Sequence, residues 1–181
     1  MVRIKKKIKE YILNSKISRL KRDVVFTKLA DCKTGLLLMH ADNAKHVGDV
    51  SSFIGKLSDK GVKVTLLIYV GNKKLEEVDT KLKGIYFNDK DLNWMKFPVK
   101  TELRRLFAED FDLMIDATMK THFPLQVISS LSRAKFKVAK NEGYRSEIAD
   151  LLISLQSEND FQEFLKQTIH YLNSINSKPN E

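Results

Sequence analysis

The sequence is short of several residue types, and each shortage excludes a class of protein. Its 181 residues include one cysteine, Cys32, which excludes an internal disulfide framework. The longest apolar-dominated run, Val62–Val70, is about half the length needed to cross a bilayer. No apolar signal-peptide stretch follows the basic N-terminus, and no repeat or Gly/Ser linker interrupts the body. We therefore expect a cytoplasmic protein with one main domain.

Sequence motifs for common chemistries are also missing. There is no G-x-G-x-x-G after the first apolar run, no G-x-x-x-x-G-K-[ST] and no G-x-S-x-G. These absences argue against a glycine-rich phosphate cradle and against a hydrolase elbow. The histidines lack recognised metal-ligand spacing, so we expect neither a metal nor a cofactor. The four histidines are His40, His46, His122 and His170.

Positive charge is concentrated near the N-terminus. Residues 1–33 hold eleven Lys/Arg against three acids, which is +8 of the chain's net +9. Apolar residues in 2–24 fall on two helical faces, which predicts two short helices or one helix with different partners at its two ends. We interpret residues 1–33 as a basic helical arm: a solvated helix, or a contact for an anionic membrane or nucleic acid. The candidate contact residues are Lys5, Lys6, Lys7, Lys9, Arg19, Lys21 and Arg22.

The remainder, 34–181, alternates apolar runs with helical patterns. Runs that are apolar on both faces, such as Gly35–Met39, are typical of strands covered by helices on both sides. The pattern predicts one Rossmann-like α/β domain of three layers, with a doubly wound, mostly parallel six-stranded sheet in the order 3-2-1-4-5-6. The predicted strands are 35–39, 62–70, 85–87, 112–116, 136–139 and 149–155.

The predicted topology places a candidate ligand cleft. Ligands of such sheets bind at the carboxyl ends of the strands where the strand order reverses, here between the first and fourth strands. An imidazole beside two carboxylates there would suit acid–base chemistry. The alternative is structural: Asp42 and Thr121 cap helices, and Asp116 accepts backbone hydrogen bonds. The candidate residues are His40, Asp42, Asn43, Asp116, Thr118 and Thr121.

The irregular segment 88–100 holds the only tryptophan. We expect Trp94 and Phe97 to pack against the edge of the sheet, with a ligand-stacking Trp94 as the alternative. Cys32 has no histidine near it in sequence, so we interpret it as an ordinary small residue.

The stretch Phe111–Ala139, FDLMIDATMKTHFPLQVISSLSRAKFKVA, resembles a family of small bacterial proteins of unknown function. With DLNWMKFP before it, GVKVTLLIYV earlier and DLLISL after it, the resemblance runs from about residue 25 to 175. It supports the fold and implies no mechanism. The FDLMID strand is also distantly similar to the N-terminal half of heptosyltransferase-type glycosyltransferases. That likeness implies an acceptor-site role for Asp49 in Val47–Val50 and a second, nucleotide-sugar domain on a partner chain.

The near-neutral body and the missing motifs favour a non-catalytic binding or interaction module, whose basic residues 1–33 contact a partner such as another protein. Two alternatives stay open. One is a small-molecule or nucleotide-sugar-binding enzyme, or half of one, that uses the cleft. The other is a protein that binds RNA or an anionic membrane surface through the N-terminal segment.

Overall fold

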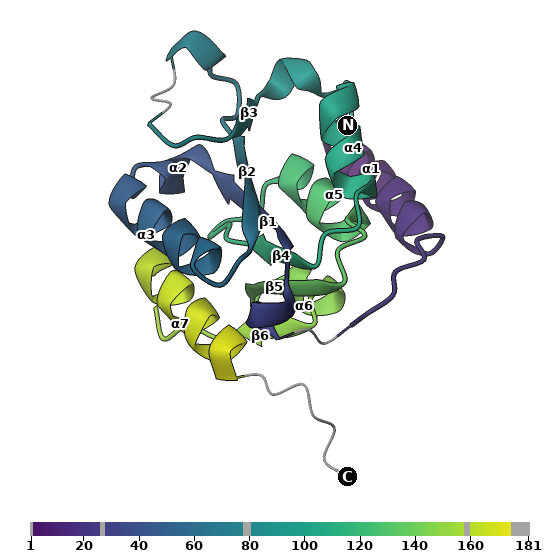
Figure 1. Cartoon of the computed structure of the whole chain (residues 1–181). Coiled ribbons are helices and arrows are strands. Elements are labelled where there is room, and N and C mark those ends of the chain that lie inside the picture. Colours follow the sequence, from purple (N-terminus) through teal and green to yellow (C-terminus); the bar gives the residue numbers. More distant parts are fainter. Residues whose placement is uncertain (1, 26–27, 78–80, 158–159, 175–181) are drawn as a thin grey trace.

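The computed structural model describes residues 2–25, 28–77, 81–157 and 160–174. Its centre is one six-stranded sheet in the order β3-β2-β1-β4-β5-β6, and every neighbouring pair is parallel (Figure 1). The predicted fold class and strand order are therefore confirmed. The strands are β1 (Thr34–His40), β2 (Lys63–Tyr69), β3 (Ile85–Phe87), β4 (Leu113–Asp116), β5 (Phe136–Lys140) and β6 (Leu151–Ile153).

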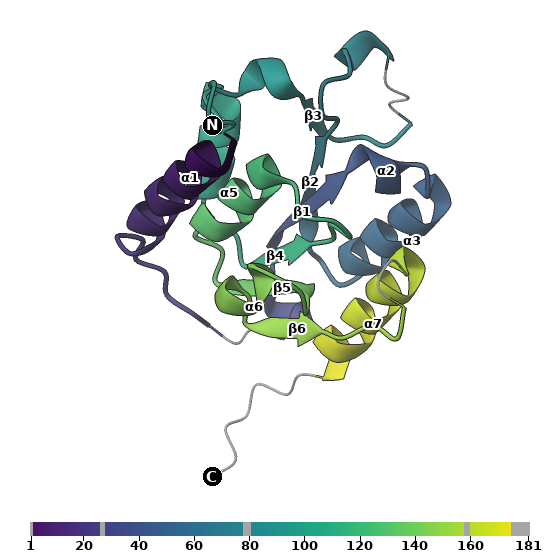
Figure 2. The same cartoon turned by 180° about the vertical axis from the view of Figure 1, so that it is seen from behind.

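Helices cover both faces of the sheet. One face carries α3 (Val47–Ser58) and α7 (Phe161–Ser174), and the other carries α4 (Thr101–Ala108) and α5 (Phe123–Leu131), as the two opposite views show (Figures 1 and 2). None of the helices described is long and apolar enough to cross a membrane. The remaining helical elements are α1 (Val2–Ile17), α2 (Ala41–Ala44), α6 (Arg145–Ile148) and the 3-10 turns Leu29–Asp31, Leu75–Glu77 and Asp89–Asp91.

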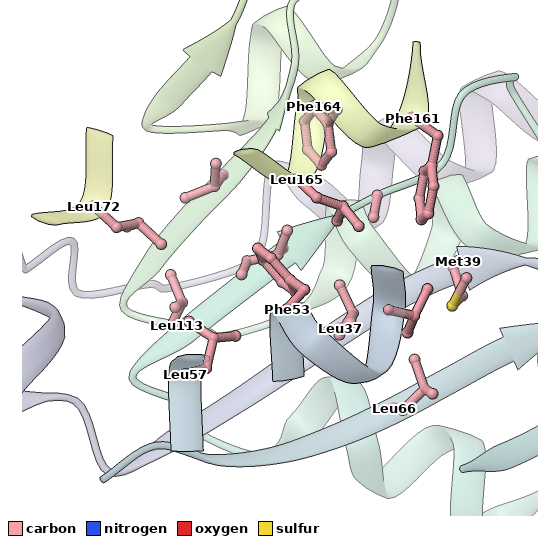
Figure 3. Close-up of a cluster of buried hydrophobic side chains, with 14 of the residues drawn as sticks. Leu37, Met39, Phe53, Leu57, Leu66, Leu113, Phe161, Phe164, Leu165 and Leu172 are labelled. Carbon is pink, nitrogen blue, oxygen red and sulfur yellow. The ribbon is translucent and has the colours of Figure 1, made fainter. Parts of the chain in front are cut away.

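Strand β1 explains how the sheet joins two cores. Successive side chains of a strand point to opposite faces. Leu37 and Met39 accordingly lie in the core beneath α3 and α7, while Leu36 and Leu38 lie in the core beneath α4 and α5. Figure 3 shows the first core, where side chains of the two helices meet those of the strands. Its labelled members are Leu37, Met39, Phe53, Leu57, Leu66, Leu113, Phe161, Phe164, Leu165 and Leu172.

The N-terminal segment forms one continuous helix, α1, rather than two short ones. Leu13 is buried and packs in a small apolar cluster with Met95, Phe97 and Val127 of α5. Fully burying a leucine is worth roughly 1.5–3 kcal/mol, so this contact holds α1 on the body. Helix α1 also lies beside α5 in both views (Figures 1 and 2). The prediction that residues 1–33 form a separate arm is therefore not confirmed.

One local expectation needs correction. Phe97 is buried as predicted, but Trp94 is 73% exposed and does not plug the sheet edge. The turn between α3 and β2 contains Gly61 at φ +87°, a left-handed conformation that glycine adopts without strain.

Candidate functional site

The register of the sheet sets the depth of each side chain at its carboxyl edge. His40 ends β1 and pairs with Tyr69, the last residue of β2. Asp116 ends β4 but pairs with Leu38, two residues before His40. Asp116 therefore lies deeper in the molecule than His40, and the loop that follows β4 rises to the level of the histidine.

That loop brings a second histidine onto His40. The rings of His40 and His122 are stacked, with 3.9 Å between their centroids and 4° between their planes. Tyr69 presents its edge to both rings at 5.8 and 6.0 Å. The three rings form one aromatic group at the ends of β1 and β2 and at the start of α5.

The histidine pair is poised to be neutral. Burial lowers the pKa of His40 below its ordinary value, against the opposing pull of Asp42. Burial, followed by repulsion from His40, lowers the pKa of His122 to about 4. Nδ1 of His40 accepts a hydrogen bond from the backbone N–H of Asp42 at 3.2 Å and so caps α2. A neutral imidazole offers one donor and one acceptor.

A cavity of about 350 Å³ opens beside this pair, and we call it the histidine cavity. It holds two lysine ammonium groups, Lys45 and Lys120, against a single lining carboxylate, Asp42. Neither lysine has a carboxylate partner among the residues described. The cavity therefore has a surplus of positive charge and hydrogen-bonding groups. Its lining consists of His40, Asp42, Asn43, Lys45, His46, Met119, Lys120, His122 and Phe161.

Beneath the loop lies a buried polar cluster centred on Asp116. Its carboxylate accepts hydrogen bonds from Tyr144 Oη at 2.6 Å, from the backbone N–H of Thr118 at 3.2 Å and from Thr118 Oγ1. The fully buried guanidinium of Arg145 lies 3.6 Å from the carboxylate through Nε. Arg145 Nη2 donates to Thr118 Oγ1 and to the carbonyl of Lys120. The cluster thus ties the β4–α5 loop to the β5–β6 connection, and burial together with Asp116 raises the pKa of Tyr144 well above its ordinary value.

A second cavity, of about 560 Å³, lies between α1 and α5, and we call it the lysine cavity. Three lysines of α1 line it together with aromatic and polar groups of the body. The loop separates it from the histidine cavity: Met119, Lys120 and His122 line the first, whereas Thr121 and Phe123 line the second. Its lining consists of Lys5, Lys6, Lys9, Glu10, Thr121, Phe123, Gln126 and Tyr144.

The six candidate cleft residues are divided between these places. His40, Asp42 and Asn43 line the histidine cavity, and Asn43 Nδ2 donates to the carbonyl of Ala117. Asp116 and Thr118 belong to the buried cluster below it. Thr121 lines the lysine cavity instead.

The residues predicted to contact an anionic partner also lie in different places in the structure. Lys5, Lys6 and Lys9 line the lysine cavity, and Lys7, Arg19 and Lys21 are exposed outside it. Arg22 forms a bidentate pair with Asp150, both contacts at 2.6 Å, so its charge is already matched.

Sequence reasoning missed six polar or charged residues of the histidine cavity or the buried cluster, namely Lys45, His46, Lys120, His122, Tyr144 and Arg145. His46, Lys45 and Lys120 follow the first and fourth strands, and that position was the available signal. Arg145 follows the fifth strand and gave no signal. In the described part of the chain, no group of three His, Cys, Asp or Glu side chains is arranged to hold a metal.

Comparisons with known proteins identify the family of this chain but no activity. A family model described as "Family of unknown function (DUF6913)" matches residues 5–175. The search of curated proteins gave no match. The expected membership of an uncharacterised family is thus confirmed, while the likeness to heptosyltransferase-type enzymes stays a prediction.

Proposed function

The chain belongs to the family of unknown function DUF6913, and we propose that it is a binding protein for a small anionic molecule held in the histidine cavity. The proposal rests mainly on the positive charge that lines this cavity. Two lysines without carboxylate partners among the described residues, and three imidazoles, face one cavity at the point where the strand order reverses. Ligands of open α/β sheets bind at that point.

The chemistry of the lining indicates the class of ligand. Lys45 and Lys120 supply point charges for a phosphate or carboxylate. Because glycine-rich backbone cradles are absent, the anion would be held by side chains rather than by backbone N–H groups. The neutral rings of His40 and His122 add donors and acceptors for hydroxyl groups. Sugar phosphates and nucleotides, including nucleotide sugars, carry both kinds of group.

The carboxylates at this edge favour binding over catalysis. Asp116, the buried carboxylate, is neutralised by Arg145 and satisfied by Tyr144 and Thr118, so it is not free to accept a substrate proton. Asp42 is the one carboxylate in the lining. We accordingly assign a binding role and no reaction.

A thermal-shift screen tests this proposal with inorganic phosphate, ribose 5-phosphate, ADP and UDP-glucose as probes. We expect at least one to raise the melting temperature, as any ligand selective for the folded state does. The variant Lys45→Ala/Lys120→Ala should reduce the shift, most of all with inorganic phosphate and ribose 5-phosphate. The matched variant Lys60→Ala/Lys63→Ala removes two exposed lysines at the opposite edge of the sheet and should keep it. No shift with any probe, or equal loss in both variants, would contradict the proposal.

A second candidate function, contact with an anionic membrane surface, is favoured by the outer face of α1. Ile4, Ile8 and Tyr11 follow one another at helical spacing, and 63%, 44% and 76% of their surfaces are exposed. They lie on the side of the helix away from Leu13. Basic amphipathic helices with such a stripe lie in the plane of anionic bilayers. Isoleucines offer RNA no stacking surface, so a membrane fits this face better.

Co-sedimentation with vesicles tests this second candidate. We expect binding to phosphatidylglycerol vesicles that exceeds binding to phosphatidylcholine vesicles, and loss of it in Ile4→Ser/Ile8→Ser. Val99→Ser removes another exposed apolar side chain, at 48% exposure, and should bind as the wild type does. Retention of single-stranded RNA without vesicle binding would favour the RNA alternative.

A further inference from the structure

Helix α1 carries exposed isoleucines on one side and lysines beside a cavity on another. Lys6 and Lys9 precede the buried Leu13 by seven and four residues, so the three lie on the same side of the helix. Leu13 packs on the body, whereas Lys6, whose side chain is 78% exposed, and Lys9 line the lysine cavity. Ile4 and Ile8 face solvent instead. Nearer its carboxyl end, Ile12 and Ile17 pack against the same apolar cluster as Leu13.

The three lysines that line the lysine cavity have little negative charge close to them. Glu10 is the one carboxylate in the lining of the lysine cavity, and it lies 3.9 Å from Lys6. Lys5 and Lys9 instead lie over aromatic rings, with the ammonium of Lys5 at 5.8 Å from the centre of the Trp94 ring and that of Lys9 at 5.0 Å from the centre of the Phe123 ring. Three cations thus surround a cavity whose protein groups neutralise one of them.

The rest of the lining is suited to a flat organic group. Phe123 and Tyr144 are partly exposed aromatic side chains, and Gln126 carries an amide donor and acceptor. The volume of about 560 Å³ is within the range of small-molecule sites, roughly 300–1,000 Å³, and is far larger than a lone phosphate requires.

We propose that the lysine cavity is a second ligand site, distinct from the histidine cavity, which binds an anion attached to an aromatic ring, with nucleotides as the chemical class. Lys5, Lys6 and Lys9 bind the phosphate, and Phe123 and Tyr144 contact the base. Residues of α1 thereby form one wall of a binding site.

The single tryptophan provides a local signal for this site. Trp94 lies beside Lys5 and lines neither the histidine cavity nor the lysine cavity. Anion binding at Lys5 changes the electrostatic environment of its ring and hence its fluorescence. Binding in the histidine cavity leaves Trp94 unaffected, so the two sites are read separately.

The experiment is a fluorescence titration, excited at 295 nm, with AMP, GMP, UMP and ribose 5-phosphate as probes. We expect a saturable change with at least one nucleotide and a response at least tenfold weaker with ribose 5-phosphate. Lys5→Ala/Lys9→Ala should weaken nucleotide binding at least tenfold. Lys7→Ala/Lys16→Ala makes the same charge change on the same helix outside the cavity and should alter binding less than twofold.

Two further variants make the outcome decisive. Lys5→Arg/Lys9→Arg keeps both charges and should bind within about threefold of the wild type, which separates lost charge from damaged folding. Lys45→Ala/Lys120→Ala should leave the Trp94 titration unchanged whether or not the histidine cavity binds its own ligand. No response to any nucleotide, or equal weakening in the two alanine pairs on α1, would overturn the second site.

Discussion

The imidazole rings of His40 and His122 lie face to face, 3.9 Å apart and within 4° of parallel. Two protonated rings in this position would repel one another, and burial also disfavours their charge. The two imidazoles are therefore neutral, and the neighbouring lysines carry the positive charge of the cavity. This division of roles underlies the proposal that the cavity holds an anion.

The histidine pair predicts a loss of stability in mild acid. The pKa of His122 is about 4 in the folded protein against 6.5 for an unperturbed histidine, so the unfolded state takes up the proton first as the pH falls. Its contribution is fully present above pH 6.5 and is lost between pH 6.5 and 4. We expect roughly 2 kcal/mol less free energy of unfolding at pH 5 than at pH 7 from this group. Urea denaturation of the wild type and His122→Phe measures it; equal pH slopes would contradict the assignment.

Lys137 predicts a gain in the free energy of unfolding in mild alkali. Burial lowers the pKa of its amine to about 7, and Nζ donates to the carbonyl of Ser129 at 2.8 Å. Between pH 7 and the ordinary lysine value near 10, the unfolded state holds the proton and the folded state does not, so stability rises with pH. From pH 7 to 8.5 we expect a gain on the order of 1–2 kcal/mol in the wild type. The variant Lys137→Met should lack this gain, and a slope that survives the substitution would refute the prediction.

Asp116 and Arg145 predict a strong coupling in the buried cluster. Asp116→Asn leaves a fully buried guanidinium without its counter-ion, which destabilises proteins by about 3–5 kcal/mol. Asp116→Asn/Arg145→Met removes both charges and should recover at least half of that loss. A double-mutant cycle by denaturant unfolding measures the coupling energy. Additive effects of the two substitutions would show that the pair does not act as a unit.

Leu13 tests whether α1 belongs to the folded body. Its side chain is 1% exposed, and replacement of a buried leucine by alanine typically lowers the free energy of unfolding by about 2–5 kcal/mol. Ile8→Ala, on the outer face of the same helix, should change it by less than about 0.5 kcal/mol. If Leu13→Ala is as mild as Ile8→Ala, residues 1–33 form an independent arm, as the sequence alone suggested.

The fold was readable from the sequence because its signals are local. Gly35–Met39 is apolar on both faces because β1 lies between two helical layers, and Gly61 marks a left-handed helix end. The composition of the site was less readable because it depends on register. Asp116 was expected beside His40, but β1 extends two residues past the partner of Asp116. His122 thus occupies the position that sequence reasoning gave to a carboxylate.

The N-terminal segment shows a second limit of sequence reasoning. Two apolar stripes on residues 2–24 predicted two partners, but a pattern does not tell which stripe is buried. Leu13 packs on the body while Ile4 and Ile8 face solvent. The placement of Lys5 and Lys9 over a cavity follows from that choice, and only the tertiary packing decides it.

The most direct test of the central proposal observes the histidines themselves. The chain has four, so their imidazole NMR signals can be assigned with single substitutions. We predict that saturation with whichever of the four thermal-shift probes stabilises the protein shifts the signals of His40, His46 and His122. The signal of His170, which is exposed on α7 outside the cavity, should stay in place. Three unchanged cavity signals, or a shift of His170 as large as theirs, would contradict an anion site in the histidine cavity.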